Sequence, residues 1–405
     1  MARLKIAAVV TEYRKYSHAQ HIVDRYLYGY GWNGKHHRPE MDVVSLYTDQ
    51  VPDHDVSRQR VAEIDHLKLY PTVAEALTLG GEDLAVDGVL LIGEHGDYPT
   101  NEKGQRLYPR YELFQQVVEV FRRSGRSVPV FNDKHLSWNW DWAVEMVQAS
   151  EELGFGLMAG SSLPCARRIP DVEMPLGSEI DEAFSLALGG VDSYDLHALE
   201  VLQCMVQRRK GGETGVAAIQ AIRGEEVWKA LKNPDWNDGG WDPELLEACL
   251  CRSHQLQSGR AGYSHVYPDD PEMRQLRGQP VIYRIEYVDG LKATMMIGGG
   301  LVGDFSFAAN VKNRPQPLST LMFLPYYDLQ NFFSPQVHHT ETLFKTGKSP
   351  YPIERTLLTT GMVAAGAESL FQGQKRLETP HLNLTYQPNP ESTDRKSTRL
   401  NSSHR

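Results

Sequence analysis

The stretch VPVFNDKHLS, residues 128–137, decides how the first half of the chain folds. Its apolar, β-branched start, Val128–Phe131, is typical of a buried parallel strand. The run then stops at the four polar residues Asn132, Asp133, Lys134 and His135. In open α/β sheets the carboxyl ends of strands face the ligand crevice, so we expect this group to line a site. The alternative interpretation is a solvated turn between a strand and a helix.

The same alternation of strand and helix patterns runs through the first 160 residues. Apolar strand-like runs lie at Leu4–Val10, Met41–Tyr47, Asp87–Gly93 and Phe155–Gly160. Helix-compatible segments lie between them, at 18–30, 73–79, 111–123 and 139–154. Strands that alternate with helices predict an α/β, Rossmann-like domain over residues 1–160, with a doubly wound parallel sheet.

After Ser161 the pattern changes to a mixture of strands and helices. The strand patterns Val281–Val288 and Leu291–Ile297 flank Asp289-Gly290, a strong hairpin signal. Helices are expected at 193–208 and 356–371. We therefore expect residues 161–390 to form a C-terminal α+β domain with a largely antiparallel open sheet.

Composition narrows the class of protein. With 405 residues, of which 41% are hydrophobic, the chain is long enough for two cores. A net charge of -10 argues against nucleic-acid binding, and no run reaches the roughly 18 apolar residues that a membrane span needs. We read no signal peptide at the start, so we expect a cytoplasmic protein. The four cysteines form no CxxC pair, which argues against a structural zinc site or a disulfide scaffold.

The last residues stand apart from the rest. DRKSTRLNSSHR, residues 394–405, has no periodicity and resembles the translation of a sequencing adapter. We expect residues 391–405 to be an appended tail that is not part of either folded domain.

Two motifs resemble those of the glucose-fructose oxidoreductase and inositol dehydrogenase (Gfo/Idh/MocA) family. Asp133-Lys134-His135 is similar to the family's EKP motif, whose lysine contacts the nicotinamide ribose and the substrate. GGVDSYDLHALE, residues 189–200, is similar to a Gly-Gly segment followed by D-x-G-x-H-x-x-D, whose histidine is the usual acid/base. The resemblance implies that Lys134 and His197 are catalytic. It implies supporting roles for Asp133, His135, Asp192, Asp195 and Glu200.

The resemblance also implies NAD or NADP as cofactor, and a homo-oligomer formed through the C-terminal sheet. The family's first βα turn is G-x-G-x-x-G-x-x-H-A, which lets the backbone approach the pyrophosphate. This chain keeps Ser17-His18-Ala19 in register but has Val10, Glu12 and Lys15 at the glycine positions. A carboxylate at Glu12 repels a pyrophosphate. The expected cofactor contacts are Thr11, Glu12, His18, Asp49, Glu94 and His95.

His197 and Glu200 lie one helical turn apart, close enough to interact. A carboxylate beside an imidazole favours its charged form, so we expect Glu200 to raise the pKa of His197.

Three functions stay open. The first is an oxidoreductase that acts on a sugar or cyclitol hydroxyl with NAD(P), in which Lys134 orients the hydroxyl and His197 takes its proton. The second is a cofactor-free or metal-assisted lyase, hydratase or isomerase of an oxidised sugar on the same scaffold. The third is a non-catalytic sugar-binding protein, in which tryptophans stack on the sugar.

The second function rests on a group of imidazoles and carboxylates that suit a divalent ion, although no spacing in the sequence requires a metal. They are His18, His21, Glu94, His95, Asp97, His135 and His197. The third rests on Trp138, Trp140, Trp142, Trp236 and Trp241.

Overall fold

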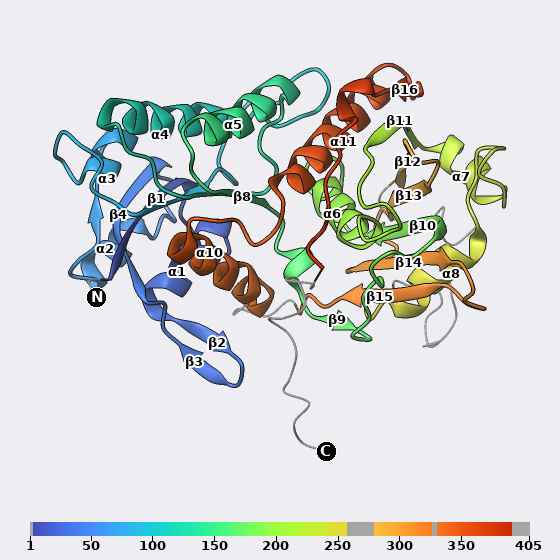
Figure 1. Ribbon diagram of the computed structural model, residues 1–405, viewed down its shortest axis with the longest axis horizontal. Coiled ribbons are helices and arrows are strands. Elements are labelled where there is room, and N and C mark those ends of the chain that lie inside the picture. The colour runs from blue at the N-terminus through green and yellow to red at the C-terminus, as the bar shows by residue number, and fades with distance from the viewer. Residues whose placement is uncertain (1–2, 257–278, 326–329, 391–405) are drawn as a thin grey trace.

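Two β-sheets lie side by side, with helix α11 (Ile353–Phe371) between them (Figure 1). The computed structural model describes residues 3–256, 279–325 and 330–390. The expected tail at 391–405 lies outside the described residues.

The first sheet has six strands, all parallel, in the order β5-β4-β1-β6-β7-β8. This is the strand order of the doubly wound dinucleotide-binding fold, so the predicted parallel sheet is confirmed. The strands are β1 (Leu4–Glu12), β4 (Met41–Gln50), β5 (Lys68–Leu69), β6 (Gly88–Ile92), β7 (Val130–Asp133) and β8 (Leu157–Gly160). Strand β7 runs two residues further than its apolar pattern predicts, which makes Lys134 the first residue beyond it.

Helices cover both faces of this sheet because successive residues of a strand point to opposite sides. Val130 packs in the core beneath one set of helices, and the next residue, Phe131, packs in the core beneath the other. The first set is α3 (Val73–Thr78), α4 (Arg110–Ser124) and α5 (Trp140–Glu152); the second is α1 (His18–Tyr28) and α10 (Ser334–Thr346). Asn139 caps α5 by accepting a hydrogen bond from the Trp142 N–H.

Helix α10 was not expected from the sequence, and it returns from the second half of the chain to the first sheet. Its Val337, Leu343 and Phe344 are buried with Ile22 of α1. A small hairpin, β2 (Tyr30–Trp32) and β3 (Lys35–His37), follows α1 and lies beside α10. The short helix α2 (Ser57–Glu63) follows β4.

The second sheet has eight strands in the order β16-β11-β12-β13-β10-β14-β15-β9. Among the described residues only β10 and β13 pair in parallel, so the predicted largely antiparallel sheet is confirmed. The strands are β9 (Arg168–Ile169), β10 (Ile180–Ala187), β11 (Val216–Arg223), β12 (Val281–Tyr287), β13 (Lys292–Ile297), β14 (Phe305–Val311), β15 (Leu318–Met322) and β16 (Leu377–Glu378). The predicted hairpin forms at Asp289-Gly290, where Gly290 has φ +94°.

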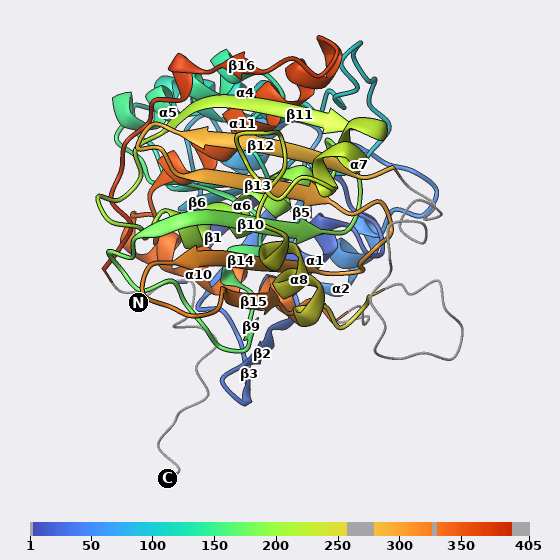
Figure 2. The same ribbon diagram turned by 90° about the vertical axis from the view of Figure 1, so that its right-hand side faces the viewer.

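Helices α6 (Asp195–Val206) and α11 cover the face of this sheet that is turned toward the first domain. Helices α7 (Glu225–Leu231) and α8 (Pro243–Arg252) pack on the other face (Figure 2). There Trp241 and Leu245 are buried with Phe184 and Ile282 of the sheet. The second sheet, through which the resemblance implies a homo-oligomer, is therefore partly covered on this face by the chain itself.

Single 3-10 turns lie at Leu163–Cys165, Asn331–Phe333 and Pro380–Leu382. Within the described residues, no helix combines the length and the apolar character that crossing a bilayer requires.

Candidate active site

A cavity of about 330 Å³ lies at the carboxyl ends of the first sheet, where the second domain meets it. Its volume is at the small end of the range for ligand sites, roughly 300 to 1,000 Å³. Its polar wall includes His18, His21, Glu94, His95, Lys134 and His197. Phe305, Leu324 and Phe333 supply apolar surface. The structure thus brings both predicted catalytic residues into one cavity.

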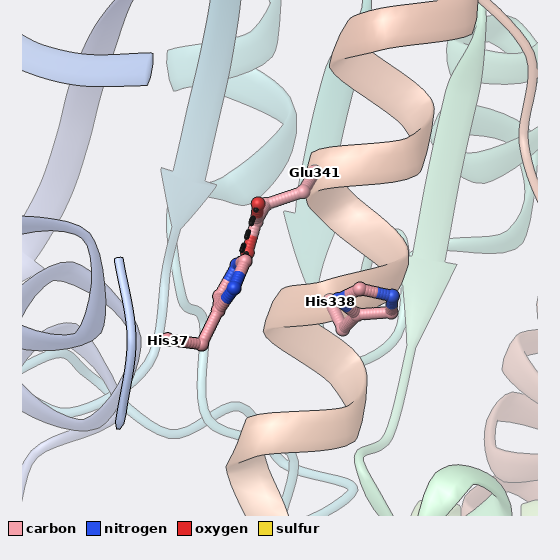
Figure 3. Close-up of side chains that lie close together, drawn as sticks. All are labelled: His37, His338 and Glu341. Atoms are coloured by element: carbon pink, nitrogen blue, oxygen red, sulfur yellow. Dashed lines mark hydrogen bonds and ion pairs between the residues drawn. The ribbon is translucent and has the colours of Figure 1, made fainter. Parts of the chain in front are cut away.

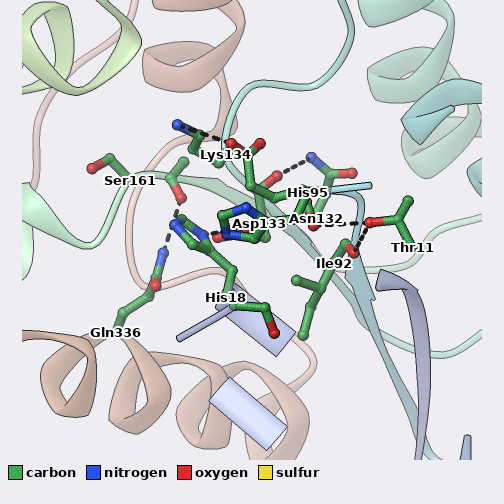
Figure 4. A network of polar contacts seen from close by, with 12 residues as sticks. Thr11, His18, Ile92, His95, Asn132, Asp133, Lys134, Ser161 and Gln336 are labelled. Carbon is green, nitrogen blue, oxygen red and sulfur yellow. Dashed lines mark hydrogen bonds and ion pairs between the residues drawn. The ribbon is translucent and has the colours of Figure 1, made fainter. Parts of the chain in front are cut away.

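Lys134 enters this cavity from the end of β7 (Figure 4). Its backbone has φ +68°, an uncommon conformation for a residue with a side chain, and it exchanges backbone hydrogen bonds with Gly160. Its Nζ donates to the Ser193 carbonyl at 2.8 Å and to His197 Nε2 at 3.0 Å. The side chain is 4% exposed. A left-handed residue held on both sides in this way is typical of functional sites.

His197 is the residue through which α6 reaches the cavity. Its Nε2 accepts from Lys134, so its Nδ1–H donates to the Ser161 hydroxyl. Burial, together with the charge of Lys134, holds the pKa of His197 well below its usual value. The imidazole is therefore neutral at physiological pH, with Nε2 as a base that faces the cavity.

The expected rise in the pKa of His197 is wrong, because that pKa is lowered. The Glu200 carboxylate is fully buried and accepts from the Ser161 N–H at 2.6 Å and from Thr356 Oγ1 at 3.0 Å. The backbone N–H of Ser161 thus bonds Glu200, and the hydroxyl of Ser161 bonds His197. Glu200 therefore fixes Ser161, the residue that fixes the orientation of the imidazole.

A buried ion-pair network lies behind Lys134. Glu94 pairs with Arg110, and its Oε1 lies 3.5 Å from Lys134 Nζ. Burial alone would raise the pKa of Glu94, but Lys134 and Arg110 outweigh it and hold the pKa well below its usual value. His135 Nε2 accepts from Arg110 Nη1 at 3.1 Å, and burial lowers the pKa of His135. His135 therefore supports Arg110 rather than facing the cavity.

Three imidazoles form the opposite wall. His18 Nδ1 lies 2.7 Å from Asp133 Oδ2, and the rings of His18 and His95 meet edge to face at 5.3 Å (Figure 4). His21 stacks on Phe333 at 5.0 Å. Burial, followed by the effect of His18, lowers the pKa of both His21 and His95 to about 3.

The Nε2 atoms of His21 and His95 are buried and have no hydrogen-bond partner within the described part of the chain. Buried polar atoms usually have a partner, so these two imidazoles are suited to contact a bound ligand.

The residues expected to hold a dinucleotide are bound to other groups. Thr11 is fully buried and donates to the Glu94 carbonyl at 2.9 Å. Glu12 pairs with Arg14, whose Nη2 lies 3.4 Å from His95 Nδ1. Asp49 accepts from the hydroxyl of Tyr98 at 2.6 Å.

The β1–α1 loop therefore does not fit a pyrophosphate in the way that a glycine turn does, because Glu12, Arg14, Lys15 and Tyr16 place side chains where the backbone would have to be bare. The loops after β4 and β6 are also joined, since the Gln50 side chain bonds the backbone N–H and carbonyl of Asp97. Asp97 is exposed and does not line the cavity.

Neither aspartate of the 189–200 motif lines the cavity. Asp192 accepts from the Arg106 N–H at 2.6 Å, and burial raises its pKa to about 6. Asp195 accepts from the Tyr283 hydroxyl at 3.0 Å, inside the second domain, and burial raises its pKa. They fix the start of α6, on which His197 lies.

The predicted tryptophans also lie elsewhere. None of the five contributes to the cavity wall, and Trp241 is buried against Phe184 in the second domain. Sequence reasoning also missed residues that do matter, namely Ser161, Ser193, Arg110 and Phe333. Ser161 follows the last strand of the first sheet, and Ser193 lies within the 189–200 motif, which were the available signals. Arg110 and Phe333 come from segments that no motif marks.

Neither a family model nor a curated protein matches the sequence. Solved structures do match it in fold. GenD2 from gentamicin A biosynthesis, in complex with NAD, has 12% identity and a TM-score of 0.56, with 93% of this chain and 97% of that chain covered. Myo-inositol dehydrogenase from Lactobacillus casei, in complex with NAD(H) and myo-inositol, has 10% identity and a TM-score of 0.54, with 96% and 99% covered.

A probable dehydrogenase from Thermotoga maritima has 11% identity and a TM-score of 0.56, with 94% and 100% covered. At such identities a likeness establishes the fold alone. Over at least 93% of its length the chain therefore has the fold of the Gfo/Idh/MocA-type dehydrogenases that its motifs resemble.

Proposed function

We propose that the protein is an oxidoreductase that acts on a hydroxyl group of a sugar or cyclitol in the cavity at the end of β7, with NAD or NADP as its redox partner. The observation that carries the proposal is the contact of Lys134 Nζ with His197 Nε2 at 3.0 Å inside that cavity. The fold supports it, because the myo-inositol dehydrogenase with this fold was solved with NAD(H) and myo-inositol.

The chain's own residues account for the proton transfer. A substrate hydroxyl that replaces the Lys134–His197 hydrogen bond accepts a hydrogen bond from the ammonium group and donates its proton to Nε2 of the neutral imidazole. The Lys134 charge then stabilises the negative charge that develops on the substrate oxygen. Ser161 keeps the imidazole in the tautomer that leaves Nε2 free to accept.

The substrate class follows from the cavity wall. The imidazole, phenol and ammonium groups of the wall form hydrogen bonds with a ligand. The carboxylate of the wall, Glu94, is already paired with Arg110. A compact polyol, or its oxidised form, can bond the Nε2 atoms of His21 and His95, which have no partner among the described residues.

A second candidate is favoured by one observation, the Glu12–Arg14 pair in the β1–α1 loop. Because this loop does not fit a pyrophosphate, we assign no step to the dinucleotide. The same proton chemistry without a redox partner would make the protein a lyase, hydratase or isomerase of an oxidised sugar.

Calorimetric titration with NAD and NADP distinguishes the two candidates. The first predicts saturable binding, and a dinucleotide at 100 times its dissociation constant should stabilise the native state by about 2.7 kcal/mol. Glu12→Gln removes the buried negative charge and should tighten binding by roughly tenfold, whereas Asp53→Asn, a nearby exposed acid, should leave it unchanged. If neither dinucleotide binds to either form of the protein, the oxidoreductase proposal fails and the second candidate replaces it.

A further inference from the structure

Two histidines and a glutamate lie together where α10 meets the β2–β3 hairpin, outside the cavity described above (Figure 3). They are His37, His338 and Glu341, and one ligand atom from each lies within 4.8 Å of the others. His37 Nε2 is 2.9 Å and 3.1 Å from the two oxygens of Glu341. None of the three belongs to the cavity that contains Lys134.

Two local patterns bring the three side chains to one point. His338 and Glu341 are separated by three residues on α10, so they share a face of that helix. His37 is the last residue of β3 and pairs with Tyr30, while the preceding His36 points to the opposite side of the hairpin. The arrangement joins residues that are 304 positions apart in the sequence.

The surroundings suit a cation. The Glu341 side chain is only 2% exposed, and a buried carboxylate is expensive unless it is paired or bound to a metal. Its nearest ammonium group, Lys345 Nζ, is 3.9 Å away and lies closer to Glu40, at 2.9 Å.

Neighbouring aromatic residues orient the set. The Tyr30 hydroxyl donates to Glu341, and the Trp32 ring stacks on His338 at 4.3 Å. Residues that contact the metal ligands and fix their orientation typically accompany metal sites.

We propose that His37, His338 and Glu341 bind one divalent transition-metal ion, for which Zn²⁺ is the best match, with water as the fourth ligand. Zn²⁺ takes imidazole and carboxylate ligands at about 2.0 to 2.2 Å, which places tetrahedral ligands about 3.4 Å from one another. The separations of His37 Nε2 from the two Glu341 oxygens, 2.9 Å and 3.1 Å, are near that value. The His37 side chain is 26% exposed, so one side of the set is open to water. The ion would hold the hairpin against α10, independently of the proposed function.

The test uses the tag-free full chain after treatment with a chelator. Calorimetry with Zn²⁺ should give one equivalent of saturable binding at this site, and Co²⁺ should give visible absorption bands of a four-coordinate ion that Zn²⁺ abolishes. His37→Gln and His338→Gln should each weaken binding by roughly tenfold or more, and Tyr30→Phe by roughly tenfold. His36→Gln is the matched control, one residue away on the exposed side of the hairpin, and should bind as the wild type does.

Two results would overturn the proposal: no saturable binding of either ion, or unchanged binding in both ligand variants, which would place the ion at the cavity histidines instead. If the variants do not fold, imidazole NMR of the wild type decides. Zn²⁺ must then shift the signals of His37 and His338; shifts confined to His18 and His95 would contradict the site.

Discussion

Lys134 Nζ lies 3.0 Å from His197 Nε2, although the two residues are 63 positions apart and belong to different domains. Lys134 extends from the end of β7 in the first domain, and His197 comes from α6, which packs on the second sheet. The contact therefore depends on how the two domains meet. Because the ammonium group donates, Nε2 must accept, and the imidazole is neutral with its hydrogen on Nδ1.

This protonation state can be observed directly. Ser161→Ala removes the acceptor of the Nδ1–H, so we expect the imidazole ¹⁵N shifts of His197 to move toward a mixture of tautomers. Glu200→Gln should leave those shifts in place while lowering the free energy of unfolding by about 1 to 3 kcal/mol, because a buried hydrogen bond to a charged group weakens. A large change of the His197 signals in Glu200→Gln with none in Ser161→Ala would reverse the assignment.

A side chain at Gly160 would collide with Glu200. A Cβ there would lie 2.7 Å from a Glu200 oxygen and 2.8 Å from Thr356 Oγ1, and φ is +121°. Gly160→Ala should therefore cost more than the roughly 1 to 3 kcal/mol of backbone strain alone, measured by urea unfolding. Gly154→Ala is the control, because Gly154 also has a positive φ but open space around it, and it should cost only the strain. Equal losses in the two variants would mean that the close approach is not real.

His21 makes stability depend on pH. The pKa of His21 is about 3 in the folded chain, below the usual 6.5. Between these two pH values the unfolded chain binds a proton at His21 and the folded chain does not. Stability is then complete above about pH 6.5 and falls as the pH is lowered toward 3. His21→Gln should reduce the slope of the unfolding free energy between pH 6 and 4 by about 1.4 kcal/mol per pH unit. His54→Gln, at an exposed position, serves as the control; an unchanged slope in His21→Gln would show that His21 is not buried as described.

Much of the fold could be predicted because the pattern was local. The apolar run before Asn132 marks a buried strand, and Asp289-Gly290 marks a hairpin. Helix α10 escaped prediction because its sequence, SPQVHHTETLFKT, carries few apolar residues and is stabilised by packing on the first sheet.

The sequence predicts where the candidate site lies, but it does not predict which residues contact one another there. Lys134 follows a parallel strand, whose carboxyl end faces the ligand crevice, and the family's motifs resemble the segments that contain Lys134 and His197. Together these two signals predict that the residues share one site. The spacing of His197 and Glu200 indicates proximity, yet it does not tell which way a carboxylate points, and Glu200 turns to Ser161 instead. His37 and Glu341 show no joint signal, because only the tertiary fold brings them together.

The most direct test of the account is turnover by Lys134 and His197 variants. A panel of sugars, cyclitols and their oxidised forms is screened with NAD and NADP, by the absorbance of the reduced nicotinamide and by chromatography of the products. For any substrate found, Lys134→Met and His197→Gln should each lower kcat/KM by roughly 10² to 10⁴, whereas Lys312→Met, at an exposed lysine, should not. Turnover at the wild-type rate in both site variants would contradict the assignment of this cavity as the active site.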